Sequence, residues 1–371
     1  MISRPFWINI LNDAWTSRSI VWLSGVRRSG KTTLSKMIPG ANYYNCDLPS
    51  VKRQLEDPEY FFNNLAESSI VIFDEIHRVD KPDIILKIGA DEFPHLKILA
   101  TGSSILSATR KFRDSLTGRK INVYFPPVLW NECINDFHLN ELDKRLLFGG
   151  LPEFLLSGER NHDLYLEWID SYYARDIQEL FNVRNRFGFL KLLNILFLQS
   201  GGLMEVSTLA KTSGLSRPTV MSHIEALQVA HAINVVQPYF GGGKKEITKR
   251  PKMYAFDTGF VAFVNGWSEI RDTERGILWE HLVLDMLKVH YGEVYYWQNK
   301  NKDEIDFVIK GANNAVHTIE CKINSSKFDP KALNKFREFY PDGRNYCFSP
   351  HIKKPYKSKF GNHEVEFRSI I

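Results

Sequence analysis

Residues 25–32, with the sequence GVRRSGKT, constrain this chain more than any other stretch. They follow an apolar run that ends at Leu23 and precede a helical pattern over residues 31–38. A strand, a glycine-containing loop and a Lys-Thr pair at a helix start form the pattern of a phosphate-binding loop. Its glycines let backbone N–H groups face a phosphate, and the helix N-terminus adds partial positive charge. The stretch therefore predicts a nucleotide site.

Each position of this loop has an expected role. Lys31 is expected to reach the β- and γ-phosphates of ATP, and the Thr32 hydroxyl is expected to hold Mg²⁺. The residues expected to bind the cofactor are Gly25, Arg27, Arg28, Ser29, Gly30, Lys31, Thr32, Thr33, Asp74 and Ser103.

A second acidic motif supports hydrolysis as well as binding. The stretch SSIVIFDEIHRV is an apolar strand that ends in Asp74 and Glu75. Asp74 is expected to hold Mg²⁺, directly or through water. Glu75 stands where a general base would polarise the attacking water.

Two further positions complete the expected ATPase site. The buried strand predicted over residues 96–100 is followed by hydroxyl side chains that would contact the γ-phosphate or the water. Ser103 is the first choice for this role, with Thr101 and Ser104 as alternatives. Arg119, just before the last strand, is either an arginine finger for a neighbouring subunit or an ordinary solvated or ion-paired arginine.

Strands and helices alternate through residues 1–137, which predicts an α/β fold with a parallel sheet and helices on both faces. The nucleotide is expected at the C-terminal ends of the strands. A chain of 371 residues suggests about two or three domains. Its 43% hydrophobic content is ample for packed cores.

Composition also bears on the compartment. No apolar run approaches the length of a membrane-spanning helix, so no membrane partner is expected. The first residues lack a signal-peptide pattern and are interpreted as an amphipathic helix packed on the first domain. The four cysteines are far apart and form no metal-binding cluster, which favours a reducing, cytoplasmic setting.

These motifs carry a family resemblance. GVRRSGKTTL, IVIFDEIHRV, ILATGSS, SLTGRK and FPPVLWNE resemble, in this order, the motifs of a large prokaryotic family of AAA-type ATPases. The stretches GGLPEFL, YYARDIQEL, LSRPTV and KRPKMYAFDTG extend the resemblance over nearly the whole chain. It implies an AAA-type nucleotide-binding module, a homo-oligomer such as a ring, and a C-terminal domain that resembles restriction endonucleases.

Residues 138–200 are rich in helix formers with apolar spacing, which predicts a helical lid on the ATPase. Arg175 would reach the nucleotide as a sensor 2 arginine, but pairing with Asp176 or Glu179 on the helix surface is the favoured interpretation.

Residues 201–262 are interpreted as a winged helix-turn-helix. Ala210, Gly214 and Val220 have the spacing of two helices packed across a glycine turn, and Ser216 would cap the second helix. The second helix is expected to expose Arg217, Thr219, Ser222 and His223 toward a DNA groove. The expected wing offers phosphate-binding side chains from Lys244, Lys245, Lys249, Arg250 and Lys252. DNA contact is favoured over a purely interdomain role, and both stay open.

Residues 263–371 suggest a nuclease-like α/β domain. An acid on a helix (Glu280), then Asp306, then Glu320-x-Lys322 resembles the PD-(D/E)xK core. Residues two apart on a strand share a face, so Glu320 and Lys322 point together. Asp306 and Glu320, with Glu280, would bind Mg²⁺ or Mn²⁺, and Lys322 would orient the attacking water. An inert acidic pocket is the equally weighted alternative.

Charge is mildly positive, at +5, and unevenly spread. Basic residues exceed acids in residues 201–260 and 321–371, and acids exceed bases between them. On charge alone, uneven surface charge is favoured over a polyanion partner. The tail would supply a DNA path, or only solubility, through Lys327, Lys331, Lys335, Arg337, Lys353, Lys354, Lys357 and Lys359.

The sequence therefore predicts an Mg²⁺-dependent AAA-type ATPase coupled to DNA, with a nuclease-like C-terminal domain. Two other interpretations stay open. One is an ATP-dependent signalling or assembly switch whose last domain binds a partner without cutting. The other is a metal-dependent nuclease regulated by ATP.

Overall fold

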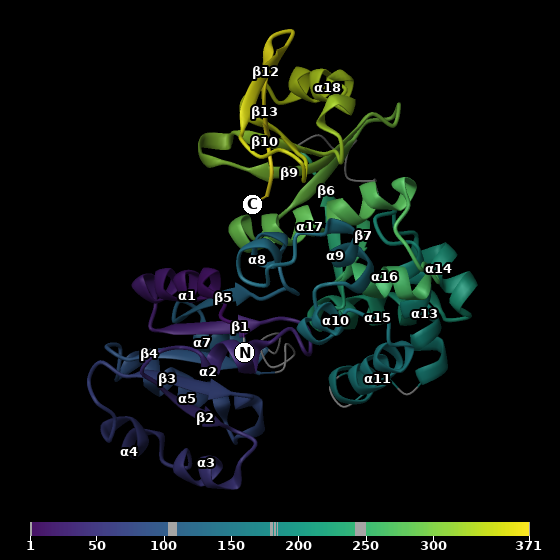
Figure 1. The fold of residues 1–371 in the computed structure, drawn as a ribbon. Coiled ribbons are helices and arrows are strands. Elements are labelled where there is room, and N and C mark those ends of the chain that lie inside the picture. The colour runs from purple at the N-terminus through teal and green to yellow at the C-terminus, as the bar shows by residue number, and fades with distance from the viewer. Residues whose placement is uncertain are drawn as a thin grey trace. The chain divides into compact units, whose positions relative to one another are not determined.

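A computed structural model of the chain describes residues 2–102, 110–178, 181, 183, 185–241 and 250–370. The chain forms two compact units. The first comprises residues 1–127, 171–182 and 229–231, and the second comprises residues 128–170, 183–228 and 232–371. Figure 1 shows the helices and strands of both units as a ribbon.

The first unit is built on a parallel sheet in the order β2-β3-β4-β1-β5. Its strands are β1 (Ile20–Ser24), β2 (Ala41–Asn45), β3 (Ile70–Asp74), β4 (Lys97–Thr101) and β5 (Lys120–Tyr124). Its helices are α1 (Pro5–Ser17), α2 (Lys31–Lys36), α3 (Pro49–Gln54), α4 (Pro58–Asn63), the short 3₁₀-helix η1 (Ile76–Arg78), α5 (Pro82–Asp91), α7 (Arg110–Leu116) and the π-helix η2 (Tyr173–Gln178). The parallel α/β fold expected for this part of the chain is confirmed.

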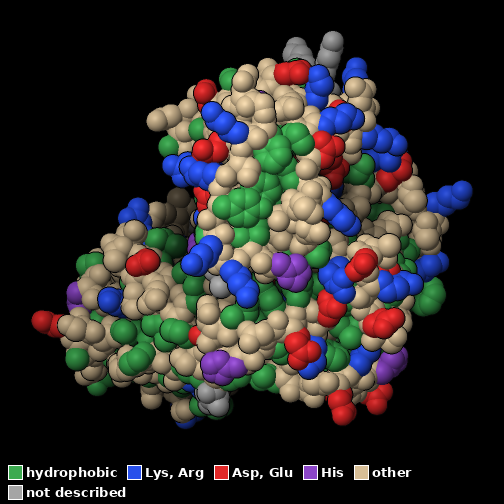
Figure 2. Space-filling view, turned by 45° about the horizontal axis from the view of Figure 1, so that its top comes forward, with side chains coloured by type: hydrophobic (Ala, Val, Ile, Leu, Met, Phe, Trp, Pro, Cys, Tyr) green, Lys and Arg blue, Asp and Glu red, His purple; other side chains and the backbone are tan. Residues whose placement is uncertain are grey.

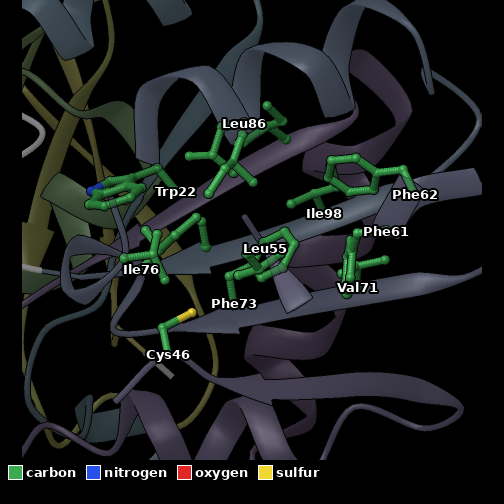
Figure 3. Packing of buried hydrophobic residues seen from close by; sticks show 14 of the residues in the cluster. Trp22, Cys46, Leu55, Phe61, Phe62, Val71, Phe73, Ile76, Leu86 and Ile98 are labelled. Carbon is green, nitrogen blue, oxygen red and sulfur yellow. The ribbon is translucent and has the colours of Figure 1, made fainter. Parts of the chain in front are cut away.

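Alternate strand residues supply two buried faces. Trp22, Phe73 and Ile98 enter one hydrophobic cluster with side chains from α3, α4, α5 and α7, as Figure 3 shows for part of the set. Their neighbours Ile72 and Leu99 are also fully buried, on the opposite face. There α1 contacts β1 and β5, and α2 contacts β2 and β3. Side chains that alternate across a strand thus explain why helices cover both faces.

The N-terminal helix is amphipathic, as predicted. Trp7, Leu11 and Trp15 are buried along one side of α1. The indole N–H of Trp15 donates to the backbone oxygen of Ile98 at 3.1 Å, and a guanidinium nitrogen of Arg4 donates to the oxygen of Ser29 at 3.1 Å. The helix is therefore fixed both to the sheet and to the phosphate loop.

The second unit combines helices with a mixed sheet in the order β12-β13-β11-β10-β9-β8-β6-β7. Its strands are β6 (Ile233–Pro238), β7 (Lys252–Ala255), β8 (Tyr295–Gln298), β9 (Glu304–Lys310), β10 (Val316–Cys321), β11 (Asn345–Phe348), β12 (Tyr356–Phe360) and β13 (His363–Arg368). Its helices are α8 (Trp130–Asn135), α9 (Leu142–Phe148), α10 (Pro152–Ser157), α11 (His162–Tyr172), α13 (Arg186–Leu198), α14 (Val206–Ser213), α15 (Arg217–Val229), α16 (Thr258–Val264), α17 (Asp272–Tyr291) and α18 (Lys331–Phe339), with short 3₁₀ turns η3 (Ala312–Asn314) and η4 (Ser325–Lys327).

The strands β6 and β7 pair antiparallel, and β6 also pairs parallel with β8 through Gln237 and Pro238. The strand pair expected to belong to a wing is thus hydrogen-bonded into the same sheet as the C-terminal strands. This pairing is not visible in the sequence pattern, because parallel partners are not joined by a short turn.

Two distant stretches that carried the family resemblance meet inside the second unit. Oδ2 of Asp257 accepts a hydrogen bond from the Gly150 N–H at 2.6 Å, and Oδ1 accepts one from the Gly259 N–H at 2.9 Å. Gly149 has φ +82°, and a Cβ there would lie 1.9 Å from Oδ1 of Asp257. GGLPEFL and FDTG are therefore structural partners, which explains the glycine at position 149.

Candidate functional site

The phosphate loop joins β1 to α2 in the first unit. All residues of β1 are buried, and Gly30, which precedes α2, has φ +99°. A Cβ at Gly25 would lie 2.0 Å from the backbone oxygen of Phe125, so only glycine lets the loop approach β5 this closely. The side chains of Thr32 and Thr33 are exposed at the start of α2. The loop residues therefore fit a nucleotide phosphate in both backbone shape and hydroxyl position.

Lys31 turns back over its own loop. Its Nζ donates to the backbone oxygens of Gly25 at 2.8 Å and Val26 at 2.9 Å. Burial lowers the pKa of Lys31, while the negative charges of Glu75, Asp176 and Asp74 act in the opposite direction. The ammonium group is thus held by its own loop and attracted by three carboxylates.

Asp74 is held by the strands on either side of it. It is 3% exposed at the end of β3. The Tyr43 hydroxyl on β2 donates to Oδ2 at 2.6 Å, and the Thr101 hydroxyl on β4 donates to Oδ1 at 2.6 Å. Burial and the bond to Asp74 raise the pKa of Tyr43. The carboxylate therefore has one fixed orientation.

Glu75 adopts a left-handed backbone conformation, with φ 58° and ψ 44°. Its N–H donates to the Thr101 hydroxyl oxygen at 3.0 Å, and its carboxylate lies 3.2 Å from Nδ1 of His77. Burial acts to raise the pKa of Glu75, but the interaction with His77 and the charges of Lys31 and Arg27 outweigh it and hold the pKa below its usual range. Glu75 is thereby kept ionised, as a general base must be.

Among the described residues, Thr101 supplies the hydroxyl group that contacts Asp74 and Glu75. It is fully buried and contacts both Asp74 and the backbone of Glu75. The first choice, Ser103, and the alternative Ser104 lie outside the described residues. Because β4 lies between β3 and β1, the last residue of that strand faces the acidic pair.

Arg119 forms a two-pronged ion pair within the first unit. Its Nε and one terminal nitrogen donate to the two carboxylate oxygens of Asp91 at 2.6 and 2.9 Å. A second terminal nitrogen donates to the Ser115 oxygen at 3.2 Å. The structure thus has Arg119 in the ion-paired arrangement, and a role toward another subunit remains a proposal.

One acid beside the phosphate loop was not expected there from the sequence. Asp176, on the π-helix η2, lies 3.6 Å from Arg27 of the loop. Arg175, the residue considered for a nucleotide contact, is exposed, and Glu179 lies outside the described residues. The acid beside Arg175 was visible in the sequence, but nothing in the pattern showed which of the two faces the loop.

A second polar cluster lies in the second unit, where β9 and β10 run antiparallel. Asp306 accepts a hydrogen bond from the Cys321 N–H at 2.7 Å. Nζ of Lys322 lies 2.8 Å from Oε2 of Glu320 and 3.6 Å from Oδ2 of Asp306. Glu320 and Lys322, which were expected to point together, are thus in contact, and Asp306 lies beside them.

Burial and charge perturb this cluster strongly. Burial, and then the charge of Asp306, raises the pKa of Glu320 to about 8. Burial and Asp306 also raise the pKa of Glu280 to about 8. Burial acts to lower the pKa of Lys322, but Asp306 and Glu320 outweigh it and raise the value. Such shifts are typical of functional sites and also of structural ion-pair networks.

Glu280 belongs to the edge of this cluster. Its Oε2 accepts a hydrogen bond from the Tyr254 hydroxyl at 2.7 Å, and the nearby Lys252 pairs with Glu304. Across the described part of the chain, no three acids, histidines or cysteines are arranged to hold a metal ion. Asp306 and Glu320 are instead bridged by Lys322.

Several expected DNA contacts are corrected by the structure. The helices α14 and α15 and the glycine turn at Gly214, with φ +76°, are present, and Arg217 and Ser222 are exposed. His223 is buried against Phe189, so it does not face a groove. Its position one turn after Val220, on the core side of the helix, explains the error.

The basic side chains expected to bind phosphate from the wing are paired with acids where the structure describes them. Lys252 is 5% exposed and bound to Glu304, so it was wrongly expected to meet phosphate. Arg250 pairs with Glu205 at 2.8 Å. Lys244, Lys245 and Lys249 lie outside the described residues.

In the tail, Arg337 is also corrected. It is buried, and it donates to Asn345 and to several backbone oxygens. Burial lowers its pKa to about 10. Figure 2 shows Lys and Arg side chains interspersed with Asp and Glu on the face in view, rather than gathered in one patch.

The first unit contains an AAA-type P-loop ATPase domain. Residues 17–134 match a family described as "AAA domain". Residues 139–271 match "Domain of unknown function (DUF8612)", and residues 275–369 match "Domain of unknown function (DUF4143)". The family comparisons thus assign chemistry to the first segment alone.

Two curated relatives are uncharacterized proteins of Mycobacterium bovis and Mycobacterium tuberculosis. Each is 26% identical to this chain over 309 residues, which is 78% of this chain and 67% of the relative. Neither description states an activity. None of the described helices is long and apolar enough to cross a membrane.

Solved structures offer only distant likeness. A Walker-type ATPase of Pyrococcus abyssi is 15% identical and covers 71% of this chain and 96% of its own, with a TM-score of 0.44. A RuvB variant of Thermotoga maritima is 17% identical and covers 63% of this chain and 89% of its own, with a TM-score of 0.32. Scores this low carry no argument about this chain.

Proposed function

We propose that this chain is an Mg²⁺-dependent ATPase coupled to DNA, with metal-dependent nuclease chemistry in its C-terminal part. One observation carries the ATPase proposal. Asp74, Glu75 and Thr101 meet at the C-terminal edge of the sheet, next to the loop that holds Lys31. A metal-holding acid, a general base and a phosphate-binding lysine on one edge are the parts that ATP hydrolysis needs.

Each residue of the ATPase site has a separate role in this proposal. The Thr32 hydroxyl and the Asp74 carboxylate would hold Mg²⁺, which supplies charge neutralisation on the outer phosphates. Lys31 exchanges the carbonyl oxygens of Gly25 and Val26 for phosphate oxygens. Glu75 turns from His77 and accepts a proton from the attacking water. Thr101 holds the backbone of Glu75 and the carboxylate of Asp74 in one arrangement.

The ATPase proposal is tested with Glu75→Gln and Lys31→Ala in the full chain. Glu75→Gln is expected to bind ATP and lose turnover by at least about a hundredfold, in the range typical of a lost general base. Lys31→Ala is expected to lose binding as well. Glu56→Gln, an exposed acid of the same unit, serves as the matched control. Turnover that survives Glu75→Gln would contradict the assignment.

The exposed face of α15 supports DNA coupling. Arg217 and Ser222 project from this helix, and the Ser216 hydroxyl caps it by accepting from the Thr219 N–H at 3.2 Å. DNA is expected to accelerate ATP turnover. Arg217→Ala is expected to weaken binding and to reduce the salt dependence by about one phosphate contact. Lys211→Ala, on α14, is the control, and a turnover rate that DNA leaves unchanged would contradict the coupling.

The arrangement of Asp306, Glu320 and Lys322 supports the nuclease proposal. Two carboxylates on adjacent strands, with a lysine against both, match the set that a divalent metal and an attacking water require. The test is cleavage of single- and double-stranded DNA and RNA with Mg²⁺ or Mn²⁺, with and without ATP. Asp306→Ala is expected to abolish cleavage, and Asp303→Ala, which removes a partner of Lys331, is expected to retain it.

A second candidate is an ATP-dependent switch whose C-terminal domain binds a partner without cutting. The contacts of Lys322 with both Glu320 and Asp306 favour it, because the ammonium group already neutralises the acidic pair. Lys322→Met decides between the candidates. If the acids form a metal site, the variant binds Mn²⁺ more tightly than the wild type but does not cleave. If neither protein binds Mn²⁺, the switch is favoured. Lys327→Met is the control.

A further inference from the structure

A short stretch of chain between two parts of the second unit belongs to the first. Residues 128–170 and 183–228 are parts of the second unit, whereas residues 171–182 are part of the first. Within this stretch the chain forms the π-helix η2 instead of continuing the α-helix α11. Such bulges often occur at functional positions. Here the altered helix carries Asp176.

Asp176 faces the cations of the phosphate loop. Its Oδ2 lies 3.6 Å from a terminal nitrogen of Arg27 and, among the described residues, has no partner at hydrogen-bonding distance. Burial raises the pKa of Asp176, and the charges of Arg27 and Lys31 oppose that rise. Glu75 acts on Asp176 as a like charge. The carboxylate is thus partly desolvated beside two loop cations, and no hydrogen bond to a described residue fixes its Oδ2 atom.

We propose that Asp176 is a specificity-determining residue of the nucleotide site. Its negative charge weakens the binding of nucleotides that carry more phosphate charge, and its contact with the loop loosens when such a nucleotide binds. The inference rests on the proposed ATPase function. Asp176 and the outer phosphates of a nucleotide are anions that draw on the same two cations, Arg27 and Lys31. Each added phosphate charge therefore weakens the attraction that holds Asp176 in place. A triphosphate displaces the carboxylate more than a diphosphate does.

The position of Asp176 in the chain allows nucleotide binding to change the segment that connects the two units. Both ends of residues 171–182 lead into the second unit, so release of η2 from the loop changes the tether between the two units. A ligand shifts such an equilibrium only by its differential interaction with the two states. Here that difference is electrostatic repulsion, and it grows with the number of phosphate charges.

The affinity test uses the full chain with Mg²⁺, ADP and adenylyl imidodiphosphate, a slowly hydrolysed ATP analogue. Asp176→Asn keeps the side-chain shape and removes the charge. It is expected to tighten binding of the triphosphate analogue about tenfold, which corresponds to about 1.4 kcal/mol, and to tighten ADP binding less. Asp170→Asn, which removes the exposed partner of Arg186, is expected to change neither affinity.

A second measurement needs no variant. Amide hydrogen exchange of residues 171–178 in the wild-type chain is expected to speed up when the triphosphate analogue binds, and less so with ADP. Unchanged or weaker analogue binding by Asp176→Asn, or slower exchange in the liganded wild type, would overturn this inference alone. A wild-type chain that binds neither nucleotide would overturn the proposed ATPase and this inference together.

Discussion

The hydroxyl of Tyr43 donates a 2.6 Å hydrogen bond to Oδ2 of Asp74, across adjacent strands of the first unit. Thr101 engages the other carboxylate oxygen from the opposite side, also at 2.6 Å. A carboxylate held at both oxygens cannot rotate freely. The position of the expected metal-binding acid is therefore set by residues on β2 and β4 as much as by β3 itself.

Removal of the Tyr43 hydroxyl is expected to impair the ATPase without unfolding it. A hydrogen bond to a charged group contributes about 1.5–3 kcal/mol. If part of this energy orients Asp74, Tyr43→Phe lowers kcat/KM for ATP about tenfold and raises the Mg²⁺ concentration needed for half-maximal turnover. Steady-state ATPase assays over a Mg²⁺ series check this. Tyr44→Phe, on the next residue of the same strand, is the control, and equal effects of both variants would contradict the prediction.

The motif-bearing part of this site was predictable from the sequence because its residues are fixed by local pattern. Gly25, Asp74 and Glu75 lie at strand ends and Lys31 lies at the start of α2, and a parallel sheet brings these positions to one edge. The exact hydroxyl was harder to choose. Thr101 is the last residue of β4, and the sequence pattern does not fix where a strand ends to within one or two residues.

Residues that act through tertiary contacts were not predictable. Asp176 lies on a π-helix that directly follows α11, and helical spacing in the sequence gives no sign of this change of helix type. Lys252 was expected to bind phosphate because its partner Glu304 lies on another strand, and the sequence does not show that the two side chains pair. His223 is different, because its spacing from Val220 already placed it on the buried side of α15.

Protonation of Glu320 is expected to make the C-terminal part of the chain pH-sensitive. Its folded-state pKa of about 8 lies above that of an unfolded glutamate, about 4.3. The contribution of Glu320 to stability is therefore full below pH about 4.3 and is lost as the pH rises through about 8. Glu320→Gln removes this loss, so the variant gains stability relative to the wild type between pH 5 and pH 8, on the order of 4 kcal/mol at about 1.4 kcal/mol per pH unit.

Urea unfolding of both proteins at several pH values measures this gain. Glu338→Gln, which removes an exposed partner of Lys335, is the matched control and is expected to give no such trend. Unfolding free energies of wild type and Glu320→Gln that run parallel over this pH range would contradict the raised pKa.

Two glycines of the second unit allow the cost of backbone strain to be measured apart from the cost of steric overlap. Gly149 and Gly158 both have positive φ, +82° and +67°. A Cβ at Gly158 would meet nothing within 4 Å, whereas one at Gly149 would overlap the Asp257 carboxylate. Gly158→Ala is expected to cost about 1–2 kcal/mol from backbone conformation alone. Gly149→Ala is expected to cost clearly more, because Asp257 must also move, and thermal unfolding of the two variants compares the costs directly.

Arg119 allows a test of assembly, because its partner within the chain is known. If Arg119 acts on the nucleotide of a neighbouring subunit, it must first leave Asp91. Arg119→Ala is then expected to lower turnover by about a thousandfold or more, as loss of an arginine finger does. Asp91→Asn, which weakens the same ion pair but leaves the arginine, is expected to keep turnover or raise it.

The ion-paired alternative predicts a different pattern from the same two variants. If Arg119 only fastens α7 to α5 through Asp91, both substitutions loosen the same exposed contact, and both leave turnover nearly unchanged. Sedimentation with and without the triphosphate analogue separates the cases further. A chain that stays monomeric in both states has no neighbour for Arg119 to reach, and any loss of turnover in Arg119→Ala would then have to come from within the same subunit.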